Sequence, residues 1–113
     1  MVLLSLCACA DKTNAPRVIS GADAGRGLEV IERVGCAACH LIPGIAWPKG
    51  AVGGDLEGFA RRSLIAGRLP NQPDTLVTWL QDPSALSPET GMPPMPLSPA
   101  EARDVAAYLY TLQ

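Results

Sequence analysis

The hydrophobic and polar positions along the chain repeat with the period of a helix in several segments. Apolar residues recur at helical spacing before Gly35, which predicts a helix over about Ala24–Val34 that this glycine ends. A short helix is expected over about Leu56–Ala66, ending at Gly67. No segment alternates strictly enough between apolar and polar residues to predict a strand.

Proline and acidic residues mark the ends of two further helices. Pro73 suits a first helical turn, and Asp82-Pro83 stops the helix that follows it. Ser98-Pro99-Ala100-Glu101 has the pattern of a capping box with proline at the first helical position, so a last helix is predicted to run to about Leu112. Its buried stripe is expected to hold Val105, Leu109 and Leu112.

Long irregular segments separate these helices. Residues 40–55 are rich in glycine and proline, and the prolines of Ser84–Leu97 predict an extended, stiff segment. The fold class is therefore all-α, with about three to five helices joined by long loops. Loops of this length make sense in a compact domain if they wrap around a bound group.

Composition limits the size of the protein and its partners. A chain of 113 residues fits one domain. The chain has only two Trp, two Tyr and one Phe, which are few aromatic side chains for a hydrophobic core. Either a large apolar cofactor or many aliphatic side chains can fill the rest of the core. The formal net charge of −2 comes with scattered Lys and Arg and no basic stripe, so nucleic acid is not expected as a partner.

The N-terminal segment begins with ten residues that are apolar apart from Ser5, and a polar stretch follows them. The apolar run is shorter than the about 20 residues that span a bilayer, and it lacks the basic region of an export signal. Leu6-Cys7-Ala8-Cys9 resembles a bacterial lipobox, in which Cys9 would carry the lipid and Met1 would be an internal or misassigned start. The alternative is a disordered or tag-like terminus. We expect residues 1–22 to be a leader and linker, outside the fold, and residues 23–113 to be the folded domain.

The stretch Cys36-Ala37-Ala38-Cys39-His40 matches C-x-x-C-H, the attachment sequence of c-type haem. Two thiols separated by two residues in a helical turn can reach the two vinyl groups of one porphyrin and form thioethers. The histidine that follows can then direct its imidazole at the iron. The motif therefore predicts one haem c attached through Cys36 and Cys39, with His40 as an iron ligand.

Other uses of the same cysteines are possible. A thiol–disulfide oxidoreductase also carries C-x-x-C, but in a βαβ setting, and no strand pattern precedes this motif. A zinc site needs further ligands, whereas the other cysteines are Cys7 and Cys9 and no second histidine exists. A structural disulfide would suit an exported protein but leaves His40 unexplained.

A second axial ligand cannot be histidine, because His40 is the only one in the sequence. Met92 lies in a proline-braced segment that can hold a thioether rigidly over the distal face of a haem. Such a soft sulfur ligand favours Fe(II) and raises the reduction potential. The alternative is that Met92 and Met95 only fill gaps in the core.

From about Gly25 to Gln113 the chain resembles a class I cytochrome c, a monohaem electron carrier with His and Met iron ligands. Besides CAACH, the resemblance rests on DTLVTWLQDP followed by SALSPETGM, and on LSPAEARDVAAYLYTL. It implies a small cytochrome c fold around one haem, with the N- and C-terminal helices crossing at Gly27 against Tyr108. It also implies that Met92 is the axial methionine and that Met95 falls beyond it.

The resemblance implies further roles near the haem. Trp79 matches a distal aromatic residue, with core packing as the alternative, Thr90 matches a residue that can hydrogen-bond a propionate, and Leu56 matches an apolar residue on the haem face. The family often has Gly-Pro-x-Leu, whose proline carbonyl accepts the imidazole N–H, where this chain has Gly53-Gly54-Asp55-Leu56. Either Gly54 takes that role less rigidly or another carbonyl replaces it.

A narrower resemblance covers RRSLIAGRLPNQPDTLVTWLQDP and ARDVAAYLYTL. These segments are similar to small cytochrome c proteins and domains that serve bacterial haem–copper terminal oxidases. In these segments, the haem propionates can pair with Arg61, Arg62 or Arg68, or these arginines can be solvated. We expect at least two of the three to be solvated.

The expected function is single-electron transfer in a bacterial respiratory chain, without enzymatic activity. The expected partners are redox proteins: a membrane terminal oxidase and an upstream quinol-oxidising complex or cytochrome. The expected location is the periplasmic side after export, with a possible tether through lipidated Cys9. The alternative is a haem enzyme or a gas or redox sensor with an open sixth iron position.

Overall fold

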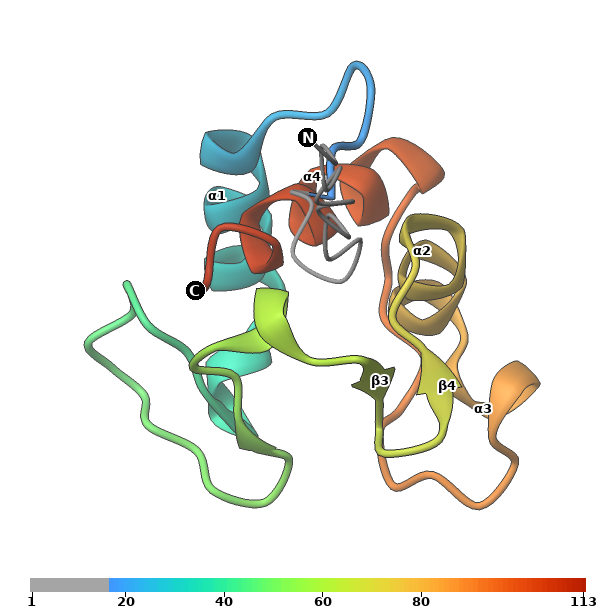
Figure 1. Ribbon diagram of the computed structural model, residues 1–113. Helices are drawn as coiled ribbons and strands as arrows, with labels where there is room; N and C mark the ends of the chain where they lie inside the picture. Colours follow the sequence, from blue (N-terminus) through green and yellow to red (C-terminus); the bar gives the residue numbers. More distant parts are fainter. Residues whose placement is uncertain (1–16) are drawn as a thin grey trace, which may run out of the picture.

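The computed structural model describes residues 17–113, and two crossing helices dominate it. Helix α1 spans Ala24–Val34 and helix α4 spans Pro99–Leu109, and Figure 1 shows α4 lying between α1 and α2. The carboxylate of Asp23 caps α1 by accepting the backbone N–H of Arg26 at 2.7 Å. Gly35, with a φ of 86°, ends α1 in the left-handed conformation, as predicted.

The C-terminal helix begins with the predicted capping box. The backbone N–H of Glu101 donates to Ser98 Oγ at 3.1 Å, and the Ser98 N–H donates to Glu101 Oε2 at 3.0 Å. The helix ends at Leu109, earlier than predicted, and the chain continues as a turn in which Leu112 is still buried. The expected apolar stripe of α4 is therefore confirmed, although part of it lies beyond the helix.

Two helices lie between these terminal ones. Helix α2, Pro73–Gln81, has the predicted proline in its first turn and ends at Asp82, and it packs against α4. Helix α3, Pro83–Leu86, is a four-residue helix within the segment expected to be extended. That expectation is correct only for the residues after α3.

Short strands and 3-10 turns shape the loops. Their bounds are η2 Cys36–Ala38, β1 His40–Leu41, β2 Gly54–Asp55, η3 Phe59–Arg61, β3 Leu64–Ile65 and β4 Leu69–Pro70. Strand β1 pairs with β2 in parallel, and β3 pairs with β4 antiparallel. These strands are too short to produce an alternating pattern, which is why none was predicted.

The helix predicted over about Leu56–Ala66 is wrong. Gly58 at a φ of 67° precedes η3, so the chain leaves the right-handed helical region there. Ala66 at 51° and Gly67 at 70° then form the tight turn between β3 and β4. Gly67 is thus a hairpin residue and not the end of a helix.

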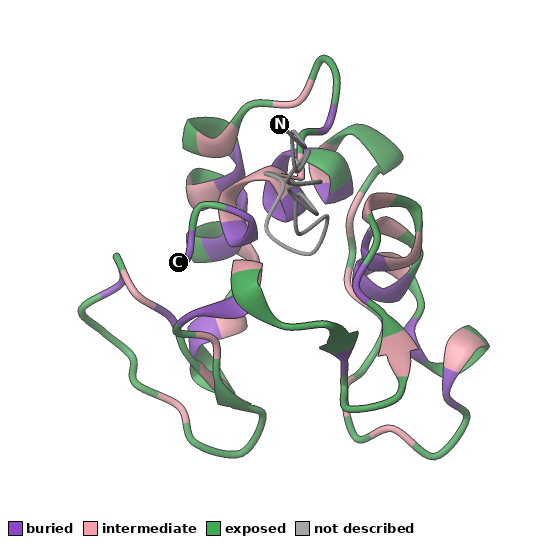
Figure 2. Ribbon diagram, viewed as in Figure 1, coloured by how far each residue is buried: buried purple, intermediate pink, exposed green. Residues whose placement is uncertain are grey.

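The core is mainly aliphatic and lies where α1, α2 and α4 face one another, as the buried faces in Figure 2 show. The four α-helices within residues 17–113, with only two-residue strands, confirm the predicted all-α class. None of the helices in this part of the chain is long and apolar enough to cross a membrane.

The start of the described chain belongs to the fold. Ile19 is only 8% exposed and joins the core. The Arg17 guanidinium donates to the carbonyl oxygens of Ala60 and Arg62 and lies 5.6 Å from the centre of the Tyr110 ring. The expectation that residues 1–22 lie outside the fold is therefore wrong from Arg17 onward. The predicted leader with Cys9 lies outside the described residues.

Candidate functional site

The two cysteines of the C-x-x-C-H motif lie in one tight turn at the end of α1. The left-handed Gly35 redirects the chain, and the N–H of Cys39 donates to the Cys36 carbonyl at 3.2 Å. Cys36 is half-buried, Cys39 is exposed, and Ala37 between them is buried. No disulfide joins Cys36 to Cys39. One turn therefore offers both sulfur atoms at the edge of the core, which suits attachment of a flat, mostly apolar group.

The imidazole of His40 is held by the backbone of the opposite strand. His40 pairs with Gly54 across β1 and β2, and its Nδ1 lies 3.0 Å from the Gly54 carbonyl oxygen. Because a carbonyl can only accept, Nδ1 carries the hydrogen in this bond and Nε2 keeps its lone pair for a metal. The carbonyl that orients His40 is thus that of Gly54.

Gly53 forms a flat wall beside the same ring. A Cβ at this position would lie 2.6 Å from His40 Cε1 and 2.7 Å from Nε2, so any larger residue would displace the imidazole. Gly53 and Gly54 together make a cradle that fits a histidine ring fixed for iron ligation.

Gly54 stands where the family pattern often has proline, and its backbone conformation is one that proline cannot adopt. Its φ is 87°, whereas the proline ring fixes φ near −65°. The segment after Gly54 is fastened from outside, because the Arg62 guanidinium donates to the carbonyl oxygens of Asp55 and, at 3.1 Å, of Glu57. Arg62 therefore forms hydrogen bonds with backbone carbonyl groups. Neither predicted role, pairing with a propionate or remaining solvated, included these bonds.

Met92 lies in the segment between α3 and α4. It is half-buried and packs against the core, and its backbone N–H donates to Thr90 Oγ1 at 3.2 Å. The side-chain amide of Gln81 donates to the Leu97 carbonyl at 3.2 Å and ties the segment to α2. Met95 is also half-buried but is not among the described residues that pack against the core. The geometry therefore favours Met92 as the inward thioether.

The other predicted site residues lie on separate elements. Trp79, on α2, is 7% exposed and belongs to the core, so a packing role is visible for it. Leu56 is half-buried against the core, and its N–H donates to the Leu41 carbonyl at 2.9 Å.

The crossing of α1 and α4 occurs at Gly27, as expected. The three atoms nearest to a Cβ on Gly27 belong to the backbone of Asp104 and Val105, and the expected packing of Tyr108 against Gly27 stays a prediction. The Tyr108 hydroxyl donates to the Pro43 carbonyl at 2.6 Å and closes over Gly44. Tyr108 therefore fastens the loop after the C-x-x-C-H turn to α4.

The sequence did not reveal a buried polar network beside η3. Asn71 is 1% exposed, and its Nδ2 donates to the carbonyl oxygens of Arg62 at 2.9 Å and Phe59 at 3.3 Å. Its Oδ1 accepts the Tyr110 hydroxyl at 3.0 Å. Burial raises the pKa of Tyr110 to about 12. An asparagine in a polar loop gives no sequence signal that it is buried.

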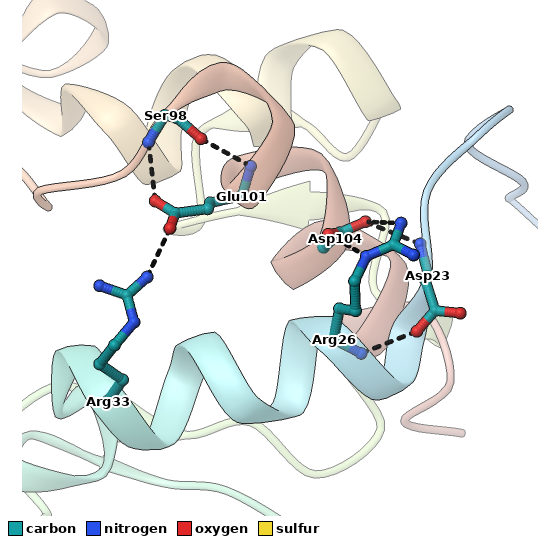
Figure 3. Close-up of polar contacts among 6 residues, drawn as sticks. All are labelled: Asp23, Arg26, Arg33, Ser98, Glu101 and Asp104. Carbon is teal, nitrogen blue, oxygen red and sulfur yellow. Dashed lines mark hydrogen bonds and ion pairs between the residues drawn. The ribbon is translucent and has the colours of Figure 1, made fainter.

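A second network joins the ends of α1 and α4 (Figure 3). Asp104 accepts the Asp23 backbone N–H at 2.7 Å and Arg26 Nε at 3.0 Å. The hydrogen bond from Arg26 lowers the pKa of Asp104. Arg33 and Glu101 form a further ion pair of 2.6 Å between these helices. Helical spacing alone does not predict these pairs, because they join residues at opposite ends of the sequence.

The alternative uses of the motif fit this geometry poorly. Burial raises the pKa of the Cys36 thiol, whereas a disulfide oxidoreductase needs a lowered one. Among residues 17–113, no three His, Cys, Asp or Glu side chains gather closely enough to hold a metal ion between them, as a zinc site would require. The combination of a free Nε2, paired thiols and an inward thioether fits a covalently attached haem.

Comparison with known proteins agrees with this fit. Residues 24–113 match the family model of cytochrome c. Over 91 residues, 80% of the chain, the sequence is 33% identical to cytochrome c oxidase subunit 2 of Alkalihalophilus pseudofirmus, of which the match covers 26%. Over 92 residues, 81% of the chain, it is 35% identical to cytochrome c-552 of Bradyrhizobium diazoefficiens, of which the match covers 77%. The chain thus spans about a quarter of the first relative and three quarters of the second.

Proposed function

Because the chain belongs to the cytochrome c family, we propose that it carries single electrons in a bacterial respiratory chain and passes them to a membrane terminal oxidase. As in this family, haem c is attached covalently through Cys36 and Cys39, and the protein is an electron carrier. When bound, the haem supplies a one-electron couple between Fe(III) and Fe(II). The observation that carries the proposal is His40, held by Gly54 with its Nε2 free.

His40 Nε2 would ligate the iron of the bound haem. Its Nδ1–H donates to the Gly54 carbonyl, which fixes the ring orientation and makes Nε2 a stronger donor. The strand pairing of His40 with Gly54 and the fastening of Asp55 by Arg62 keep that carbonyl in place.

Met92 would supply the second iron ligand when haem is bound. Its thioether would stabilise Fe(II) and raise the reduction potential. Thr90 Oγ1 accepts the Met92 backbone N–H, and its hydroxyl would donate to a propionate of the bound haem, while Gln81 braces the far end of the segment. Trp79 and Leu56 would present apolar surface to the haem and so disfavour the additional charge of the ferric state.

The partners are proposed from the names of the relatives. One is an oxidase subunit, so we assign a haem–copper terminal oxidase as acceptor and a quinol-oxidising complex or another cytochrome as donor. We further propose that the protein works on the periplasmic side after export and is tethered there through lipid on Cys9. Mass spectrometry of the protein from its native membrane would report haem and lipid together.

A visible spectrum of the reduced protein, with and without carbon monoxide, tests the proposal. With Met92 bound, the iron is six-coordinate and low-spin, and the spectrum stays the same when carbon monoxide is added. Ready binding of carbon monoxide would contradict the proposal and favour a haem enzyme or a gas or redox sensor with an open sixth position. Transfer to the purified terminal oxidase would then test the acceptor separately.

A further inference from the structure

Residues 17–22, here called the N-terminal strap, lead into α1 and are fastened to the domain (Figure 1). Ile19 is buried in the core, and the Arg103 guanidinium on α4 donates to the Ser20 carbonyl. The Ala22 N–H donates to the Ile19 carbonyl at 3.2 Å, which closes a turn just before α1. The strap is therefore anchored at several points and is part of the folded domain.

Arg17 fastens the start of the strap to the turn η3. Its guanidinium donates to the Ala60 carbonyl and, at 3.3 Å, to the Arg62 carbonyl, and it lies 5.6 Å from the centre of the Tyr110 ring. The Ala60 N–H donates to the Leu112 carbonyl at 2.8 Å, so both ends of the described chain hold η3. Because the planar guanidinium binds two carbonyl oxygens at once, it fixes how the backbone runs between them.

The backbone of Arg62, at the end of η3, is held from three directions. Its N–H donates to the Phe59 carbonyl at 3.1 Å, and its carbonyl accepts from Asn71 Nδ2 at 2.9 Å as well as from Arg17. Arg62 therefore starts from a fixed base, and its side chain needs little further ordering to reach a partner.

The side chain of Arg62 connects η3 to the segment that holds the haem ligand. Its guanidinium donates to the carbonyl oxygens of Asp55 and, at 3.1 Å, of Glu57. Asp55 directly follows Gly54, whose carbonyl oxygen lies 3.0 Å from His40 Nδ1. A short series of hydrogen bonds thus runs from the strap to the group that orients the imidazole.

We propose that Arg17 is a positioning residue for the iron ligand: by holding η3, it keeps the Arg62 guanidinium where it braces the Gly54 segment and so keeps the Gly54 carbonyl on His40 Nδ1. The inference rests on the proposed electron-carrier function. A firm bond at Nδ1 makes Nε2 a stronger donor, which favours Fe(III) when haem is bound. The strap thereby lowers the reduction potential from outside the haem site.

The sign of the change in reduction potential tests this role in Arg17→Ala. Loss of the brace should weaken the hydrogen bond on His40 and raise the potential of the haem-containing protein. Loss of a positive charge alone would lower the potential, because a nearby cation favours Fe(II) over Fe(III). Arg17→Lys keeps the charge and can still donate to a carbonyl, so its potential should lie between those of the wild type and Arg17→Ala.

Arg103→Ala is the matched control. Arg103 also carries one positive charge and also binds the strap, but it does so from α4 and not through η3. This variant should not raise the potential. Arg62→Ala should raise it, and adding Arg17→Ala to Arg62→Ala should raise it no further, because both residues act through the same connection.

Amide hydrogen exchange gives a readout that does not depend on electron transfer. The Leu56 N–H donates to the Leu41 carbonyl at 2.9 Å, so its exchange reports on the Gly54 segment. In Arg17→Ala this exchange should be at least about fivefold faster, as expected for the loss of one hydrogen bond. Exchange of the Gly35 N–H, at the end of α1, should change less than about twofold.

An unchanged or lowered potential in Arg17→Ala would overturn the positioning role, and so would an equal rise in Arg103→Ala. Equal acceleration of exchange at Leu56 and Gly35 would also overturn it, since the strap would then only stabilise the whole fold. Failure of the proposed function is seen separately, as carbon monoxide binding to the reduced wild type.

Discussion

The carbonyl oxygen of Asp104 fills the space that a side chain on Gly27 would need. A Cβ at position 27 would lie 2.0 Å from this oxygen and 2.5 Å from the Asp104 carbonyl carbon. Both atoms belong to the backbone of α4, so they can move only if the helix moves. Glycine at position 27 therefore sets how closely α1 and α4 approach each other.

Replacing Gly27 by valine is expected to lower the free energy of unfolding by more than about 1–3 kcal/mol, the usual cost of overpacking a core. Thermal unfolding of the haem-containing protein measures the loss. Gly25→Ala is the control on the same helix, since its Cβ would meet only the Asp23 carboxylate, at 3.2 Å. A Gly27→Val protein as stable as the wild type would place the crossing elsewhere.

Asp104 should make stability depend on pH in acid. Its pKa is lowered in the folded state by the hydrogen bond from Arg26, so its contribution is fully present above the unfolded pKa of about 3.9. That contribution is lost as the pH falls through the folded pKa. Thermal midpoints of the wild type and Asp104→Asn should therefore differ most at neutral pH and converge below about pH 4. A constant difference between pH 7 and pH 3 would contradict this role.

Tyr110 should affect stability at the alkaline end. Its pKa of about 12 lies above the ordinary value of 10.0, so the neutral phenol stabilises the fold below pH 10. This stabilisation is lost as the pH rises through about 12. Tyr110→Phe should abolish that part of the alkaline loss. At pH 7 it should cost about 1–3 kcal/mol, because Asn71 Oδ1 is left buried without a donor.

Gly54→Ala tests the hold on His40. A left-handed φ of 87° is strained for alanine by about 1–2 kcal/mol, and relief of the strain should pull the Gly54 carbonyl away from His40 Nδ1. The weaker hydrogen bond makes Nε2 a poorer donor, so a potentiometric titration should give a higher reduction potential. Gly67→Ala has similar strain, with a φ of 70° and open space around its Cβ, but should leave the potential unchanged. Equal potentials in both variants would refute the link to His40.

Met92 and Met95 can be distinguished by spectroscopy. Met92→Ala should lower the reduction potential, remove the weak long-wavelength band of ferric haem bound to a thioether, and let the reduced iron bind carbon monoxide. Met95→Ala should keep the band and change stability only modestly, because Met95 does not pack against the core among the described residues. The reverse pattern would transfer the ligand role to Met95, and absence of the band from the wild type would favour the open-iron alternative.

Structure governed by near neighbours could be predicted from the sequence. Asp23, Gly35 and the capping box at Ser98 act on backbone groups within a few residues, and α1, α2 and the start of α4 appear where these signals place them. The spacing within CAACH is equally local, since one turn of chain carries both thiols and the histidine. The error at residues 56–66 is local too, because Gly67 was interpreted as the end of a helix, whereas both Gly67 and Gly58, which lies inside the predicted helix, are left-handed turn residues.

The tertiary structure alone decided which groups hold the site in place. The Gly54 carbonyl that fixes His40 is 14 positions away, Asn71 and Tyr110 are 39 apart, and Asp23 and Asp104 are 81 apart. Each of these bonds joins a polar side chain to a group that only folding brings near, and a loop asparagine or a helical aspartate has the same sequence pattern when exposed or buried. How much each bond contributes depends on how far its groups are shielded from water, which the packing of the whole chain decides.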